Sequence, residues 1–330
     1  MSDSLHHTLL TLDSHIDIPW PDAEDPFTET SRCLDIPKMR AGGLKAACLV
    51  AYVPQGKLEP EGHEAATARA LAMLETINRI GHNHAARLTP MVDEIEAAAA
   101  EGLPAIIPVV ENGYAIGTDL ANIARFRALG ARYITLTHNG HNALADSAVP
   151  RRDLGDRPAL HGGLSDLGRA AIAEMNRLGV VVDVSHTSRA AMLEATAASA
   201  FPVVASHSCA AALCNHPRNL DDEQLDALAA AGGVIQITAV AYFVRRGGTV
   251  HDTFVSHFCD HIEYVARRIG VDHVGIGSDF DGGGELADWR DASQCPNVTK
   301  DLQGRGYDDE QIAKIWGGNF RRVLRASETK

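Results

Sequence analysis

The feature that most constrains the fold is an alternation of short apolar, β-branched runs with longer segments of helical period. The apolar runs lie at residues 8–12, 44–51, 105–110, 133–137, 180–184, 203–205, 234–238 and 273–276. Helices are predicted at about 62–82, 91–101, 119–129, 166–178, 188–199, 221–231, 252–270 and 308–325. Nearly continuous apolar runs are typical of parallel strands that are buried on both faces. Eight such strands with intervening helices predict a (β/α)8 barrel, and a doubly wound open sheet is the alternative.

We expect one domain over residues 1–330, because no composition shift, charge block or Pro/Ser-rich linker divides the chain. Hydrophobic residues make up 45% of the 330 residues, which is enough for a sizeable core. The connections at 139–165 and 281–300 are too long for plain loops. Each is therefore expected to fold over some part of the barrel.

The charge and the cysteines exclude several classes of protein. Acidic residues exceed basic ones by 43 to 30, for a net charge of −13. That balance argues against binding to nucleic acid or to an anionic membrane, because such binding relies on Lys and Arg. The six cysteines include no CxxC pair, which favours buried, reduced thiols in a cytoplasmic protein. We see neither a signal peptide nor an apolar run that would span a bilayer.

Metal-binding residue types recur where the predicted strands end. In a barrel, the residues just beyond the C-terminal strand ends converge on one mouth. In chain order these residues are Asp13, His15, Asp17, Glu111, His138, Asp183, His186, His207, Asp279 and Asp281. His15 and Asp17 stand two residues apart, so both can face the same side of a strand. Imidazole and carboxylate are the ligands of Zn²⁺, with Mn²⁺ or Co²⁺ as substitutes.

This set would overfill one ion, whereas two ions that share a bridging carboxylate would use it well. Glu111 is the best candidate for the bridge. A carbamylated lysine, which related barrel hydrolases often use there, is excluded because no lysine lies between Lys57 and Lys300. A single His at a strand end is more often structural than a ligand. Asp13 and Asp183 are expected to orient neighbouring His residues, and Asp281 to cap or orient the loop after Asp279.

The strand-end motifs occur together in a distinctive order along nearly the whole chain. They are Asp-x-His-x-Asp at 13–17, Val-Glu-Asn-Gly at 110–113, Leu-Thr-His-Asn at 136–139, Asp-Val-Ser-His at 183–186, Ser-His-Ser at 206–208, His-Pro-Arg-Asn at 216–219, Gly-Ser-Asp-Phe-Asp-Gly at 277–282 and Gly-Gly-Asn-Phe-x-Arg-Val at 317–323. In this combination the chain resembles the membrane (renal) dipeptidase family, peptidase family M19, as a bacterial-type soluble member.

The resemblance implies an amidohydrolase-like (β/α)8 barrel with two Zn²⁺ per chain, which hydrolyses dipeptides with a metal-bridging hydroxide. It implies L-Xaa-L/D-Xaa substrates, with tolerance of a D-residue at the C-terminal position, and it is compatible with a homodimer. The roles that it implies are as follows: His15 and Asp17 bind one ion, His186 and His207 bind the other, Glu111 bridges them, His138 steadies the oxygen of the intermediate, Arg218 holds the substrate carboxylate, and Asp279 is the acid/base.

Several alternatives stay open at the sequence level. A planar guanidinium suits a substrate carboxylate, but Arg218 could equally pair with Asp221 or Asp222 at a helix start. The family's tyrosine after the seventh strand is not matched cleanly, so either Tyr242 takes over its contact with the substrate or that contact is lost. The alternative function is hydrolysis of a cyclic amide, a lactone or another small ester. A non-catalytic metal-binding protein is disfavoured, because every expected ligand is present.

Overall fold

The computed structural model describes residues 2–21 and 24–328, and a parallel sheet lies at its centre. The strands are β1 Leu12–Asp17, β2 Ala46–Tyr52, β3 Arg87–Leu88, β4 Ala105–Glu111, β5 Tyr133–Thr135, β6 Val181–Asp183, β7 Val204–Ser208, β8 Val234–Ile237 and β9 Val274–Ile276. Eight of them follow one another in the order β1-β2-β4-β5-β6-β7-β8-β9, and the short β3 pairs with β4 alone. Every pairing is parallel, which confirms the (β/α)8 barrel.

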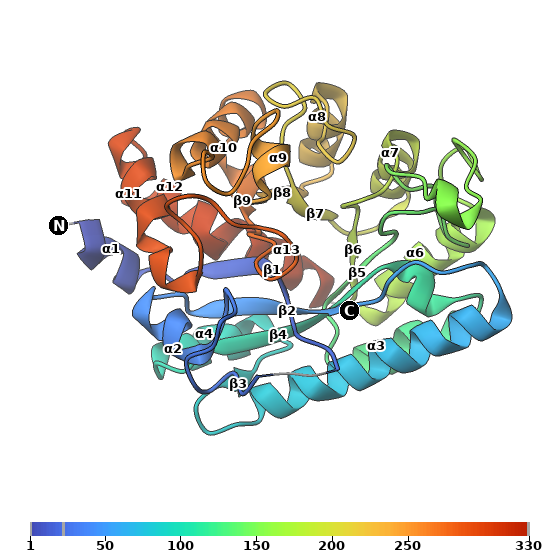
Figure 1. The fold of residues 1–330 in the computed structure, drawn as a ribbon, viewed down its shortest axis with the longest axis horizontal. Helices are drawn as coiled ribbons and strands as arrows, with labels where there is room; N and C mark the ends of the chain where they lie inside the picture. Colours follow the sequence, from blue (N-terminus) through green and yellow to red (C-terminus); the bar gives the residue numbers. More distant parts are fainter. Residues whose placement is uncertain (1, 22–23, 329–330) are drawn as a thin grey trace.

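Helices surround the strands. They are α1 Ser2–Thr8, α2 Ile36–Ala41, α3 Pro60–Gly81, α4 Val92–Ala100, α5 Ala121–Ala128, α6 Asp166–Leu178, α7 Arg189–Ala198, α8 Asp222–Ala230, α9 Ala241–Val244, α10 Val255–Ile269, α11 Pro296–Gly304, α12 Asp309–Ala313 and α13 Asn319–Glu328. Figure 1 shows the long α3 along one side of the sheet and α7, α8 and α10 along the opposite side. Ser165 and Ser188 cap α6 and α7, because their hydroxyl groups accept the N–H groups of Gly168 and Ala191.

The barrel closes at a seam between β1 and the segment that follows β9. Ile16 and Phe280 form an isolated parallel bridge there. The Asp17 N–H donates to the Phe280 carbonyl at 3.0 Å, and the Asp279 N–H donates to the His15 carbonyl at 3.0 Å. The end of the first strand and the segment after the last strand are therefore neighbours at the mouth of the barrel.

The first strand differs from the sequence-based prediction. Residues 8–12 were expected to form it, but Ser2–Thr8 is helical and the strand runs over Leu12–Asp17. The reason is that β1 points polar side chains into the barrel mouth, so it lacks a continuous apolar run. The predicted helix at 308–325 is divided into α12, a π-helical turn over Lys314–Gly318, and α13. The sequence also missed β3, α2, α9 and α11.

Both long connections contain ordered structure. The segment 139–165 has a 3₁₀ turn at Arg152–Leu154, and the Ser147 hydroxyl donates to the His138 carbonyl at 2.5 Å. The segment 281–300 contains a 3₁₀ turn at Ala292–Gln294 and the start of α11. The Glu285 N–H in that segment donates to the Ala239 carbonyl at 3.1 Å. Among the helices of the described residues, none has the length and apolar character needed to cross a membrane.

Arg132 fastens α13 to the barrel, since its side chain is only 1% exposed and lies 3.0 Å from the Glu328 carboxylate. The same guanidinium donates to the Leu324 carbonyl at 3.0 Å and to the Ser327 hydroxyl at 2.9 Å. We predict that Arg132→Met lowers the free energy of unfolding by about 3–5 kcal/mol, because Glu328 loses its partner in a largely buried setting. Urea denaturation followed by circular dichroism measures this loss.

Arg87 provides the matched control. It pairs with Glu101 on the surface, where the two side chains are 38% and 53% exposed. Arg87→Met should leave the free energy of unfolding close to the wild-type value, because a solvated ion pair contributes little to stability. Equal losses in the two variants would contradict the role assigned to Arg132.

Candidate metal centre and active site

A cavity of about 360 Å³ opens at the mouth of the barrel. Its lining consists mostly of polar and aromatic residues, which come from strand ends and the loops that follow: Asp17, Tyr52, Glu111, His138, Asn139, Val149, His186, His207, His216, Arg218, Val240, Tyr242, Phe243, Asp279 and Gly282. The seven residues predicted as metal-binding or catalytic all lie in or beside this cavity, since His15 is 3.7 Å from Glu111. The C-terminal face of the barrel is therefore the candidate site.

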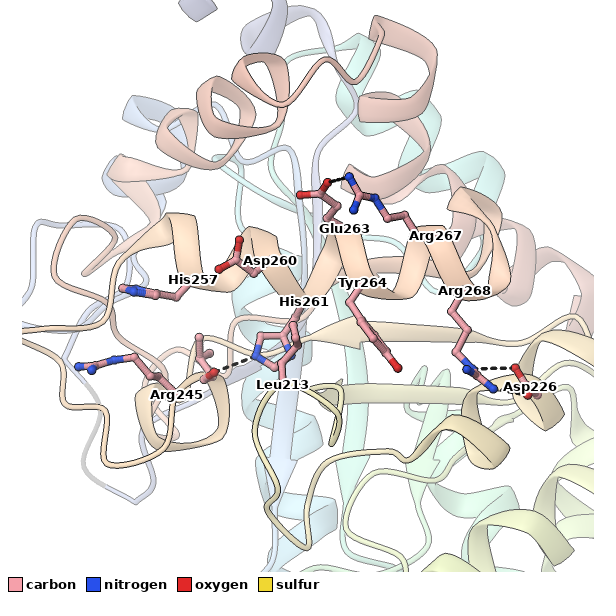
Figure 2. A pocket seen from close by; sticks show the side chains of 11 residues that line it. Leu213, Asp226, Arg245, His257, Asp260, His261, Glu263, Tyr264, Arg267 and Arg268 are labelled. Carbon is pink, nitrogen blue, oxygen red and sulfur yellow. Dashed lines mark hydrogen bonds and ion pairs between the residues drawn. The ribbon is translucent and has the colours of Figure 1, made fainter.

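A larger groove of about 880 Å³ runs along α10 (Figure 2). Its charged side chains form ion pairs, as in Arg267–Glu263 and Arg268–Asp226 within the groove and Asp260–Arg305 at its edge. The ring of His261 is likewise satisfied, because Nδ1 accepts from the Ala210 N–H and Nε2 donates to the Val244 carbonyl. Paired groups of this kind are typical of a solvated surface, so the groove is a weaker candidate than the barrel mouth.

Glu111 lies at the centre of the histidine cluster, at the last position of β4, and its side chain is only 4% exposed. Its Oε1 is 3.2 Å from His186 Nε2 and 3.4 Å from His207 Nε2. Its Oε2 is 3.7 Å from His15 Nε2. The two ring atoms His186 Nε2 and His207 Nε2 are 2.9 Å apart. Two groups here have metal-site geometry, namely His15 with Glu111 and His207, and Glu111 with His138 and His186.

The tautomer of His15 follows from its hydrogen bonds. Its Nδ1 lies 2.7 Å from the Tyr133 hydroxyl, and that hydroxyl donates its own proton to the Ser14 carbonyl at 2.8 Å. The Tyr133 oxygen must therefore accept a hydrogen bond from Nδ1–H of His15. The Nε2 atom then carries a lone pair that faces Glu111, and this buried atom has no hydrogen-bond partner.

His207 and His186 have the same tautomer. His207 Nδ1 is 2.8 Å from the Ser206 hydroxyl, which donates to Asp183 at 2.6 Å and so accepts from His207. His186 Nδ1 is 3.1 Å from the Asn139 side-chain oxygen, an acceptor, so Nδ1 carries the proton. In both rings the Nε2 lone pair faces Glu111. In the contact between His186 Nε2 and His207 Nε2, two unprotonated nitrogen atoms therefore face each other without a hydrogen between them.

Three imidazole lone pairs and a carboxylate that meet in a buried space repel one another unless a cation lies between them. Asp17 Oδ1, like His15 Nε2, is a buried atom without a hydrogen-bond partner among the described residues. Burial raises the pKa of Asp17 to about 7 and that of Glu111 to about 8. Burial also holds the pKa values of His186 and His207 well below the usual range, so both rings are neutral. These residues fit a divalent metal, which would neutralise the carboxylates and accept the lone pairs.

Asp13 and Asp183 support the cluster without entering it. Asp183 accepts from the Ser206 hydroxyl and from the Ser206 N–H at 3.0 Å, so it orients His207 through a serine. Asp13 accepts the backbone N–H groups of His15 at 3.1 Å and of Ser278 at 3.0 Å. Asp13 thus holds the backbone of a candidate ligand and not its ring.

Arg218 is buried at 3% exposure, in the loop between β7 and α8. Its Nη2 donates to the His207 carbonyl at 3.1 Å, its Cζ lies 5.4 Å from the centre of the Phe243 ring, and its buried Nε has no hydrogen-bond partner. The carboxylates that could have paired with it at the helix start have other partners, because Asp221 binds Arg189 and Asp222 binds Arg268. The helix-start ion pair considered for Arg218 is therefore wrong.

The other predicted residues lie around the cluster. His138 Nε2 is 4.0 Å from Glu111 Oε1, and burial lowers the pKa of this imidazole to about 3. Asp279 Oδ1 is 4.0 Å from His15 Nε2, and burial raises the pKa of this carboxyl well above its usual range. Tyr242 lies at the rim with 55% exposure, and its ring centre is 4.6 Å from that of Phe243.

Sequence reasoning missed Tyr52, Tyr133, Asn139 and Ser206. Tyr52 ends β2 and lines the cavity, and its ring centre is 4.8 Å from that of His138. The strand-end rule that identified the ligands could have identified Tyr52 as well. Tyr133 and Ser206 precede their strand ends, and only the folded register shows which ring each of them contacts.

Comparisons with known proteins agree with this geometry. A family model described as membrane dipeptidase (peptidase family M19) matches residues 2–330. The chain is 32% identical over 322 residues to dipeptidase tcpJ of Claviceps purpurea (strain 20.1), which covers 96% of this chain and 74% of that protein. The probable dipeptidase PvdM from Pseudomonas aeruginosa superimposes with a TM-score of 0.92 at 29% identity, covering 99% of this chain and 97% of PvdM. The structure of dipeptidase AC, a metallopeptidase of family M19, has a TM-score of 0.86 at 26% identity, covering 97% of this chain and 99% of the other.

The tautomer argument predicts a role for the Tyr133 hydroxyl. Tyr133→Phe removes the acceptor that holds the proton of His15 on Nδ1. We expect zinc affinity to fall about 10–100-fold, as for other partners of ligating histidines, with little change in the far-UV spectrum. Competition with a chelating dye measures the affinity. The control is Tyr264→Phe, whose hydroxyl bonds Asp222 on the surface. Equal affinity in the wild type and Tyr133→Phe would contradict the assignment.

Proposed function

The chain belongs to the membrane dipeptidase family, peptidase family M19, and from this premise we propose that it is a binuclear zinc enzyme that hydrolyses dipeptides. The observation that carries the proposal is the pairing of two features in one cavity. Three imidazole lone pairs face the buried Glu111, and beside them lies the buried guanidinium of Arg218, which forms no ion pair with any carboxylate in the part of the chain that the structure describes. The first feature suits metal ions and the second suits an anionic substrate group.

Each residue of the cluster has a place in the proposed metal site. His15 and Asp17 would hold one Zn²⁺. His186 and His207 would hold a second, and Glu111 would bind both ions. Mn²⁺ or Co²⁺ could substitute for Zn²⁺. A bound pair of ions supplies a water of lowered pKa and polarises the peptide carbonyl. Tyr133, Ser206 and Asn139 would keep the Nε2 atoms free for this purpose.

Arg218 would bind the C-terminal carboxylate of the substrate, because its unpartnered Nε offers a donor beside Nη2. With the carboxylate fixed so close to Glu111 and the histidines, a longer peptide has no free carboxylate to offer, which restricts the substrates to dipeptides. Recognition of the carboxylate leaves the side chain of the C-terminal residue less constrained. We therefore propose L-Xaa-L/D-Xaa substrates, with Tyr242 at the rim as a further contact.

Asp279 and His138 would move and stabilise charge during hydrolysis. Asp279 lies beside the candidate metal ligands, with Oδ1 4.0 Å from His15 Nε2, so it would take the proton of the attacking water and pass it to the leaving amine. His138 is neutral because its pKa is low, and it can donate a hydrogen bond to the carbonyl oxygen as negative charge develops there.

We also propose that the enzyme works in the cytoplasm on small dipeptides. All six cysteines are buried and free, which supports a reducing compartment. The net charge of −13 gives no electrostatic basis for binding nucleic acid or an anionic membrane. The organisation as one domain and a homodimer both stay predictions.

A substrate panel tests the function directly. The zinc-loaded protein should release amino acids from L-Ala-L-Xaa and L-Ala-D-Xaa dipeptides, and it should leave tripeptides and N-acyl amino acid amides intact. Mass spectrometry of the products identifies the bond that is cleaved. Turnover of a lactone or a cyclic amide without turnover of any dipeptide would overturn the proposal in favour of the alternative hydrolase.

Arg218→Met tests how the carboxylate is recognised. Because a hydrogen bond to a charged group contributes about 1.5–3 kcal/mol, KM for a dipeptide should rise about 10–150-fold. The activity on the corresponding dipeptide amide, which lacks the carboxylate, should change little. Steady-state kinetics on both substrates gives the comparison. A parallel loss on the amide would show that Arg218 does not act through the carboxylate.

Asp279→Asn tests the proton transfer. The amide cannot accept a proton, so kcat should fall about 10²–10⁴-fold while KM and zinc content stay near the wild-type values. Kinetics and elemental analysis of the same preparation separate the two effects. A variant that retains zinc and full activity would exclude Asp279 as the acid/base.

A further inference from the structure

We propose that Arg32 and Asp281 act as positioning residues, which form a clamp that fixes Asp17 relative to Asp279 across the seam of the barrel. The inference rests on the proposed roles of Asp17 as a metal ligand and of Asp279 as the acid/base. Neither Arg32 nor Asp281 lines the cavity. Their effect on the reaction would therefore be exerted through the two carboxylates that do.

At the seam, Asp17 and Asp279 lie on two different segments, so their relative position depends on the contacts between those segments. Asp17 ends β1, and Asp279 follows β9, which already ends at Ile276. The bridge Ile16–Phe280 and its two backbone hydrogen bonds connect these segments at the mouth, and the Asp13 carboxylate also accepts the Ser278 N–H. A carboxylate on each side of a short bridge can shift unless further contacts fix it.

Arg32 supplies the contact with β1. Its Nη2 donates to the Asp17 carbonyl at 2.6 Å and lies 3.1 Å from Asp281 Oδ2. The exposed fractions of the Arg32 and Asp281 side chains are 20% and 8%. An ion pair so far removed from water is less screened than a pair on the open surface.

Asp281 connects the loop after β9 to the same segment. Its Oδ1 accepts the Cys33 N–H at 2.8 Å, and its Oδ2 accepts the Leu34 N–H at 3.1 Å. The backbone of Asp281 has φ 64°, in the left-handed region that non-glycine residues rarely adopt. The side-chain contacts hold the residue in this conformation, and they also link the loop to Arg32 and thereby to Asp17.

Gly282 shows how closely the two carboxylates approach. A Cβ at this position would collide with Asp279 Oδ1 and with Asp17 Oδ2, so both carboxylates flank the same glycine. The turn is tight, since the Gly282 and Gly284 N–H groups both donate to the Asp279 carbonyl, at 3.1 Å and 2.7 Å. A small displacement of this turn therefore changes the spacing between Asp17 and Asp279.

The test compares Arg32→Met, Arg32→Lys and Asp281→Asn with the wild type. Asn also tolerates positive φ, so Asp281→Asn removes the charge without changing the backbone preference. Zinc content is measured by elemental analysis, and zinc affinity by competition with a chelator. Steady-state kinetics with a dipeptide gives kcat and KM. We expect one of two ions to bind about 10–100-fold more weakly in Arg32→Met and Asp281→Asn, kcat to fall, and KM to stay within about twofold because Arg218 is untouched.

Three comparisons make the result decisive. Asp17→Asn should weaken the same single ion, and Arg32→Lys should restore part of the affinity. The losses in Arg32→Met and Asp281→Asn should not add in the double variant, since the two residues share one contact. The control variants are Arg177→Met and Glu174→Gln, an exposed ion pair on α6, which should behave as wild type.

Several outcomes would overturn the clamp. These are wild-type zinc affinity and kcat in both clamp variants, equal weakening of both ions, or a rise of KM alone. If Arg32→Met fails to fold, Asp281→Asn and Arg32→Lys still give the affinity comparison. A wild type that binds two zinc ions but cleaves no dipeptide would defeat the proposed substrate, whereas the zinc measurements would still decide for or against the clamp.

Discussion

The candidate site is organised by the three imidazole lone pairs that point at the buried Glu111 carboxyl group. His15, His186 and His207 each have Nδ1 occupied by an acceptor, so each directs an unprotonated Nε2 at a buried carboxylate. Such an arrangement costs free energy in the absence of a cation, because three imidazole lone pairs converge on one buried carboxyl group. The barrel maintains it because the ligands come from separate strand ends, which the sheet holds rigidly in place.

The groups that fix the rings lie deeper in the barrel than the rings themselves. Tyr133 connects His15 to the Ser14 carbonyl, and Asp183 with Ser206 supports His207. These partners are fully buried, so water cannot compete for the same hydrogen bonds. The affinity for a metal ion would therefore depend on these buried core residues as well as on the residues that would contact the ion.

The sequence was sufficient to predict the barrel and to bring the candidate ligands together, because parallel strands must end on one face. That rule placed Glu111, His186 and His207 at a common mouth, as the structure shows. It misplaced the first strand, since a strand that carries Asp13, His15 and Asp17 has no apolar run to mark it. Contacts such as Tyr133 with His15, or Arg32 with Asp281, join residues more than a hundred positions apart and depend on the folded register.

The charges of the cavity connect the metal site to the choice of substrate. The carboxylates of Asp17, Glu111 and Asp279 together would offset only part of the charge of two divalent ions, and the buried Arg218 adds a further positive charge. A cavity of positive potential favours a substrate with a fixed carboxylate and stabilises the oxygen that becomes negative during hydrolysis. A neutral lactone would gain only the second of these effects. The buried Arg218 guanidinium, which forms no ion pair with a carboxylate of the described residues, is therefore the feature that favours a dipeptide over an uncharged substrate on this barrel.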